Sequence, residues 1–251
     1  MDLSSPDPAA AAAFYGELLG WEIVERAPAD RDGGYWIFTS DGDEVAGLGP
    51  LQGPETPPHW TIYVAVADTD AAVATVEAHG GRTLAGPIEI PDTGRMAVLA
   101  DGADGAAFAV WEPLGFRGAG AVNRAGAWTM AELDTRDVAG AERFYRAVFE
   151  WELERIEAGG ALIYGSLKLD GRLVAGLLPI GEQFPPQVPA HWIPYFGVDD
   201  LERAATRAGE LGGRALTPPV EVPQGRFVVL ADPHGAGFAV WQGSYDPPPG
   251  A

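Results

Sequence analysis

The chain has 251 residues, no cysteine and a formal net charge of −20 at pH 7. The absence of cysteine excludes disulfides, thiolate metal sites and cysteine nucleophiles. The acidic balance disfavours nucleic acid and anionic membranes as partners, and no apolar run is long enough to span a bilayer. The N-terminus carries no basic n-region, so no signal peptide is expected and the protein is predicted to be cytoplasmic.

The first fifty residues predict one helix followed by three short strands. Asp7 is a helix N-cap with Pro8 at the first helical position, and Gly20 lies where a left-handed C-cap belongs. The strands expected after it are 21–25, 35–39 and 44–48.

The next segment has the same plan, with a strand in front. Residues 60–66 predict a strand, 69–79 a helix that ends before Gly80, and three further strands follow at 83–90, 96–99 and 107–111. Asp68 opens this helix, and Asp137 and Asp199 are expected to open two more.

The second half of the chain repeats the first at an offset of 129 to 132 residues. Because the order and spacing hold across the whole half, the chain is a tandem duplication. The clearest repeated pairs are Phe14-Tyr15 with Phe144-Tyr145, Trp21-Glu22 with Trp151-Glu152, His59-Trp60 with His191-Trp192, and Phe108–Trp111 with Phe238–Trp241.

Each half divides again into two βαβββ modules, which gives four modules in all. Their ranges are 1–51, 58–113, 127–181 and 189–243, with a Gly/Ala-rich linker at 114–126 and a Pro-rich tail at 244–251. The first copy is short at its start, because the counterparts of Trp128 and Met130 fall at or before residue 1. The sequence leaves open whether the chain is trimmed or its first strand is stunted.

This arrangement resembles the vicinal oxygen chelate superfamily, which includes glyoxalase I, bleomycin-resistance proteins and extradiol dioxygenases. The resemblance rests on the four modules, the Phe-Tyr pair within an Asp-capped helix, and the turn Asp232–Gly235 before the last strand. It covers residues 1–243. It implies an α+β fold of two tandem glyoxalase/bleomycin-resistance-like domains, 1–113 and 127–243, each with a concave mixed sheet and outer helices.

Metal-using members of this superfamily place His or Glu on the first and last strands of their modules. The corresponding positions here are Met130, Thr61, Ile193, Ala109 and Ala239, and none of them can hold a divalent metal. The resemblance therefore implies that the inherited metal site is lost, and no metal cofactor is expected.

Other ionisable side chains share the pocket face of these strands, because alternate residues point the same way. Glu132 lies two residues after Met130, with Asp2 as its first-half equivalent, and His59 and His191 lie on the second strand. Glu132 is a candidate catalytic base. A displaced metal site is the weaker alternative, since one acid and one His per half fall short of three ligands. The structural alternatives are solvated strand-edge acids and histidines that cap turns.

Aromatic side chains surround the apolar ligand positions and suit a pocket for a flat ligand. Plain core packing explains them equally well. These candidate ligand-binding residues are Tyr63, Trp111, Trp128, Tyr195 and Trp241. Arg95 and Arg226 follow a glycine in the same turn of each half, where they could grip a ligand carboxylate or simply pair with nearby acids.

The favoured hypothesis is therefore a metal-free protein that binds an aromatic or apolar metabolite or drug, as antibiotic-resistance proteins do. It predicts a monomer or homodimer with no nucleic-acid or membrane partner. The alternative is a divergent lyase, isomerase or oxygenase acting on a small organic substrate, dependent on a divalent metal or using Glu132 as base. A non-catalytic interaction scaffold is a third hypothesis.

Overall fold

The computed structural model describes residues 1–27, 33–53, 55–182 and 184–245. They form two compact units. Unit 1 contains residues 1–61, 118–130 and the chain from 194 onward, and unit 2 contains 62–117 and 131–193. Each compact unit thus combines one module from each half of the sequence. The domains 1–113 and 127–243 describe the two copies of the sequence repeat and remain a prediction.

The first module of unit 1 builds a five-stranded sheet in the order β2-β3-β4-β1-β5. Strand β1 runs parallel to β4 and antiparallel to β5, so the sheet is mixed. The elements are β1 (Asp2–Ser5), α1 (Pro8–Leu19), β2 (Glu22–Ala27), β3 (Tyr35–Ser40), β4 (Asp43–Pro50) and β5 (His59–Thr61).

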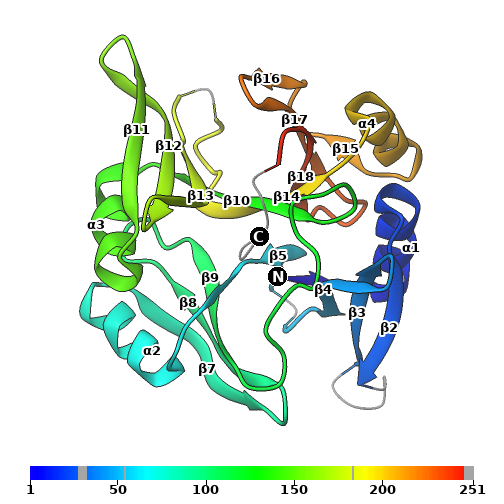
Figure 1. The fold of residues 1–251 in the computed structure, drawn as a ribbon, viewed down its shortest axis with the longest axis horizontal. Coiled ribbons are helices and arrows are strands. Elements are labelled where there is room, and N and C mark those ends of the chain that lie inside the picture. The colour runs from blue at the N-terminus through cyan, green and yellow to red at the C-terminus, as the bar shows by residue number, and fades with distance from the viewer. Residues whose placement is uncertain (28–32, 54, 183, 246–251) are drawn as a thin grey trace. The chain divides into compact units, whose positions relative to one another are not determined.

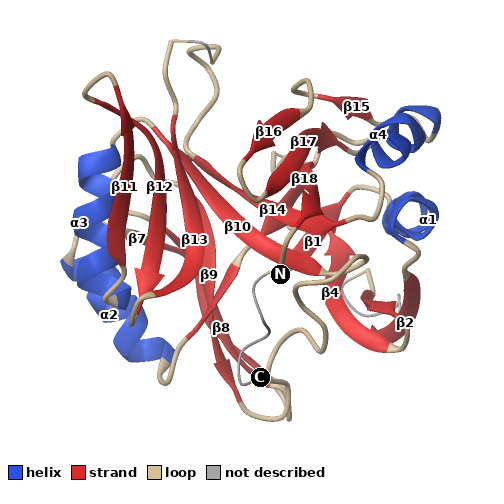
Figure 2. Ribbon diagram, turned by 45° about the horizontal axis from the view of Figure 1, so that its top comes forward, coloured by secondary structure: helices blue, strands red, loops and turns tan. Residues whose placement is uncertain are grey.

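In the last module of unit 1, β18 runs parallel to the end of β14 and antiparallel to β17. Helices α1 and α4 lie side by side (Figures 1 and 2). The elements are β14 (His191–Gly197), α4 (Leu201–Glu210), β15 (Arg214–Ala215), β16 (Val220–Val222), β17 (Gly225–Ala231) and β18 (Gly237–Gly243).

Unit 2 combines a sheet in the order β6-β9-β8-β7 with the strands β11-β12-β13-β10. Helices α2 and α3 lie side by side (Figure 1). The elements are β6 (Tyr63–Ala65), α2 (Thr69–Ala78), β7 (Arg82–Ile90), β8 (Gly94–Ala100), β9 (Ala107–Pro113), β10 (Trp128–Thr135), α3 (Val138–Phe149), β11 (Glu152–Ala158), β12 (Ala161–Leu169) and β13 (Arg172–Pro179).

The predicted elements are confirmed, with two corrections. The strand expected at 60–66 is divided at Ile62 into β5 and β6. The cap of α4 is Asp200 rather than Asp199, because Asp200 accepts the backbone N–H of Arg203 at 2.9 Å. The other three helices begin at the expected aspartates. No helix in the described residues is long and apolar enough to cross a membrane.

A buried hydrogen-bonded trio connects the two modules within each unit. In unit 1, Tyr15 of α1 donates its hydroxyl to Asp232 of the last hairpin at 3.3 Å and receives the Trp60 indole N–H at 3.0 Å. In unit 2, Tyr145 makes the same contacts with Asp101 at 3.1 Å and Trp192 at 3.2 Å.

Each aspartate of these trios also closes its own hairpin. Oδ1 of Asp232 accepts the backbone N–H groups of His234, Gly235 and Ala236 at 2.8–2.9 Å. Asp101 accepts three such groups in the same way. A carboxylate with four donors is well satisfied although it is buried.

Replacing Asp232 by Ala should therefore destabilise the protein by about 3 kcal/mol, because four donors lose a charged acceptor in a buried place. Urea unfolding measures the change. Tyr15→Phe, which removes only the hydroxyl, should cost less, at about 1 kcal/mol. An unchanged midpoint for Asp232→Ala would contradict the role assigned to the trio.

Candidate functional site

Two buried carboxyl groups lie on the same face of β10. Glu132 is 3% exposed and Asp134 is 2% exposed, and the two side chains hydrogen-bond to each other. Burial raises the pKa of Asp134 from 3.8 to about 9, and the neighbouring Glu132 charge adds to this shift. The pair therefore holds a proton at neutral pH. The alternative interpretation of Glu132 as a solvated strand-edge acid is wrong.

The neighbouring strands place a tyrosine and a glycine beside this pair. Tyr164 of β12 donates its hydroxyl to Glu132, and burial, followed by the Glu132 charge, raises the pKa of Tyr164. Gly176 of β13 pairs with Glu132 in register. A Cβ atom at Gly176 would collide with the Tyr164 hydroxyl and approach Glu132 Oε2 to 3.2 Å. Glycine is thus needed for the phenol and the carboxyl to meet.

His191 at the start of β14 completes the group that we name the carboxyl cluster: Glu132, Asp134, Tyr164 and His191. Its Nδ1 lies 2.9 Å from the carbonyl oxygen of Pro189. Because a carbonyl only accepts, Nδ1 carries the hydrogen and Nε2 has a lone pair. Nε2 lies 3.8 Å from Asp134 Oδ2, and the His191 side chain is 35% exposed. Burial lowers the pKa of His191, which favours the neutral ring.

The first repeat contains the same arrangement with one difference. Tyr35 donates to Asp2 Oδ1 at 2.7 Å, and a Cβ atom at Gly47 would collide with both groups. His59 binds the carbonyl oxygen of Pro57 at 2.8 Å through Nδ1.

The difference is the second carboxyl group, because Ser4 stands where the second repeat has Asp134. Ser4 pairs in register with His59 on β5. Both histidines bind a proline carbonyl two residues earlier, which agrees with the interpretation that they cap turns. His191 differs from His59 in also facing a buried acid.

The aromatic candidates fall into separate groups. In unit 2, Tyr63 lies edge-on to Trp111, with ring centroids 6.3 Å apart, and its hydroxyl contacts Met96 Sδ at 3.8 Å. Trp111 donates to the Phe116 carbonyl at 2.9 Å.

In unit 1, Tyr195 is 1% exposed and packs on Phe227 at 5.3 Å, which is a core position. Trp241 is partly buried and donates to the Ser244 carbonyl at 3.3 Å. The indole nitrogen of Trp128 is buried, and no hydrogen-bond partner for it is found among the described residues.

Both candidate arginines are already bound to acids. Arg95 grips Asp70 with two hydrogen bonds of 3.0 and 3.2 Å, with Glu112 at 3.7 Å. Arg226 grips Glu202 at 2.6 and 2.5 Å and also contacts Gln242. These contacts agree with the ion-pair interpretation of the two side chains.

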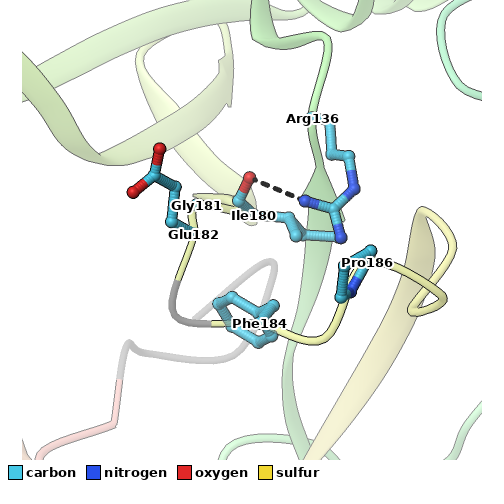
Figure 3. Close-up of a pocket in the computed structure, with 6 residues that line it drawn as sticks. All are labelled: Arg136, Ile180, Gly181, Glu182, Phe184 and Pro186. Carbon is cyan, nitrogen blue, oxygen red and sulfur yellow. Dashed lines mark hydrogen bonds between the residues drawn. The ribbon is translucent and has the colours of Figure 1, made fainter.

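A cavity of about 490 Å³ lies where the chain leaves β13, and the sequence did not suggest it (Figure 3). The guanidinium group of Arg136 donates to the carbonyl oxygens of Pro185 and Val188 at 3.1 and 3.3 Å, which fixes the loop. The Pro-rich composition after β13 was the only signal. The lining residues are Arg136, Ile180, Gly181, Glu182, Phe184 and Pro186.

The donor set does not fit a divalent metal. Among the residues that the structure describes, no group of three or more His, Asp and Glu side chains is arranged to hold one. In the carboxyl cluster, Asp134 retains its proton and Glu132 is hydrogen-bonded to Tyr164.

Asp134→Asn should raise stability increasingly from pH 5 to pH 8. The pKa of Asp134 is about 9 in the folded protein, against the ordinary value of 3.8 that applies to the unfolded chain. The ionised Asp134 therefore destabilises the folded protein increasingly as pH rises between these two values. Melting curves at pH 8 should show a Tm gain of about 3 °C or more. Glu25→Gln, on the exposed strand β2, is the matched control. A constant difference across this pH range would contradict a proton-holding pair.

Comparisons with known proteins agree with the duplicated fold. Residues 1–110 match the family model described as the Glyoxalase/Bleomycin resistance protein/Dioxygenase superfamily, and residues 130–241 match a Glyoxalase-like domain. The protein named "Putative glyoxylase CFP32" of Mycobacterium bovis is 36% identical over 96% of this chain and 92% of its own. Anthracycline biosynthesis protein DauV of Streptomyces sp. is 38% identical over 95% and 90%.

The solved Mn(II)-bound glyoxalase from Novosphingobium aromaticivorans has a TM-score of 0.64 at 20% identity, covering 98% of this chain and 82% of that one. This likeness concerns the fold. Together with two tandem glyoxalase-like regions and mixed α+β modules, these matches show that the chain belongs to the glyoxalase/bleomycin resistance protein/dioxygenase superfamily.

Proposed function

We propose that the chain binds a small organic molecule, aromatic or apolar in character, at the carboxyl cluster of the second repeat. The observation that carries this proposal is Asp134 Oδ1, a buried acceptor with no hydrogen-bond partner among the described residues. Leaving such a group unsatisfied costs about 1–3 kcal/mol, so native proteins keep one where a ligand or water completes it. The His191 side chain, which is 35% exposed, offers the approach to it from solvent.

The relatives support an aromatic ligand. DauV is named for anthracycline biosynthesis, as is DnrV of Streptomyces peucetius, which is 37% identical to this chain. Anthracyclines are aromatic polycyclic compounds. The family description also includes bleomycin resistance, which supports sequestration of a drug or metabolite. The net charge of −20 favours a neutral or cationic ligand over nucleic acid.

An enzyme is the second candidate, and the same pair favours it. A protonated acid hydrogen-bonded to a carboxylate provides a general acid and a general base together. In this reading, Glu132 accepts the proton from a carbon next to a carbonyl, and Asp134 supplies one to the oxygen. Such chemistry belongs to an isomerase or lyase acting on a small carbonyl compound. An oxygenase is the weaker form of this candidate, because the donor set does not suit a metal.

Gly176→Ala should abolish binding of an anthracycline, measured by quenching of its fluorescence, because the new Cβ displaces Tyr164 from Glu132. Gly47→Ala makes the same change in the first repeat and is the matched control, expected to leave binding intact. The two variants should melt within a few degrees of each other. Equal binding by both variants and the wild-type protein would place the ligand elsewhere.

For the enzyme candidate, deuterium exchange into the benzylic position of phenylacetone in D₂O is the readout, followed by NMR. Glu132→Gln should slow any catalysed exchange by about 100-fold, because it removes the base. Exchange that persists in Glu132→Gln would eliminate Glu132 as the base.

A further inference from the structure

The carboxyl cluster contains two adjacent acceptor atoms, a buried carboxyl oxygen of Asp134 and the partly exposed Nε2 of His191. Among the residues that the structure describes, Asp134 Oδ1 has no hydrogen-bond partner, although Asp134 is 98% buried. His191 Nε2 lies 3.8 Å from Asp134 Oδ2, which is too long for a hydrogen bond. The proton that the acid pair retains lies between Asp134 and Glu132, so it does not satisfy Asp134 Oδ1.

We propose that the second repeat selects a ligand that is not an anion and that carries an O–H or N–H group, which the ligand donates to Asp134 and His191. This inference rests on the proposed function and names the chemical class of its ligand. A hydroxylated aromatic compound of the phenol or enol type fits both acceptors, because it combines a donor with an apolar ring.

The same geometry rejects anions. Glu132 keeps a negative charge beside Asp134, and these two carboxyl groups already do not ionise together. A ligand carboxylate would bring a second negative charge to the same place. The groups that face Asp134 are Glu132 on its own strand, Tyr164 on β12 and His191 on β14. None of them is a cation at neutral pH, so an incoming anion finds no counter-charge there.

The first repeat lacks this selectivity. Ser4 replaces Asp134, and a hydroxyl can both donate and accept, so no buried acceptor without a donor is created. A duplicated site with one altered residue therefore offers an internal comparison within a single chain.

Three naphthalene probes of similar shape test the inference by isothermal titration calorimetry at pH 7. They are 2-naphthol, which carries a donor, 2-methoxynaphthalene, which lacks it, and 2-naphthoate, which is an anion. The wild-type protein should bind 2-naphthol about tenfold or more tightly than the methyl ether, because only the hydroxyl satisfies the buried acceptor. It should bind 2-naphthoate most weakly.

Asp134→Ser gives the second repeat the residue of the first and should remove the preference for 2-naphthol over the ether. Ser4→Ala, in the first repeat, is the control and should preserve it. Melting curves establish that both variants fold, and the wild-type comparison needs no variant at all.

Equal affinity of the wild-type protein for 2-naphthol and its ether would overturn the inference and show that Asp134 is satisfied by water. An unchanged preference in Asp134→Ser would also overturn it. Both results leave binding of aromatic compounds intact. Failure of all three probes to bind would instead count against the proposed function itself.

Discussion

A phenol hydroxyl buried between an aspartate and an indole holds each compact unit together. The tyrosine belongs to the helix of one module and the aspartate to the terminal hairpin of another, so the bond joins segments far apart in sequence. The aspartate simultaneously fixes its own hairpin through three backbone N–H groups. These buried polar contacts therefore connect the helix of one module to the hairpin of another within each unit.

Local patterning was enough to predict most of the secondary structure. Aspartate caps, the glycine after α1 and alternating strands are short-range signals, and the duplication supplied the caps and the strands twice, although Glu150 replaces the glycine after α3. The compact units were not foreseeable in this way. They arise from helix pairs α1 with α4 and α2 with α3, and nothing in a local window indicates which helices will meet.

The candidate site was predicted in part. Strand alternation from Met130 predicted Glu132, and alternation from Ile193 predicted His191, as pocket-facing residues; the structure places both in the carboxyl cluster. Asp134 lies two residues after Glu132 and was not singled out, because alternation along one strand does not show which acids are buried together. Tyr164 was overlooked, although Tyr35 repeats it at the offset of 129 residues that the duplication sets. Its role depends on pairing between neighbouring strands, which a single strand does not reveal.

The glycines that oppose Glu132 and Asp2 have a consequence for how this protein can evolve. Each one fixes the frame of its site, because any side chain there would separate the phenol from the acid. The position occupied by Asp134 and Ser4 carries a side chain in both repeats, and the two repeats already differ there. A duplicated scaffold of this kind can alter the ionic character of one site by a single substitution, while the backbone around it remains unchanged. The glycine keeps the geometry of the site the same in both repeats, while the residue at the position of Ser4 and Asp134 sets its charge.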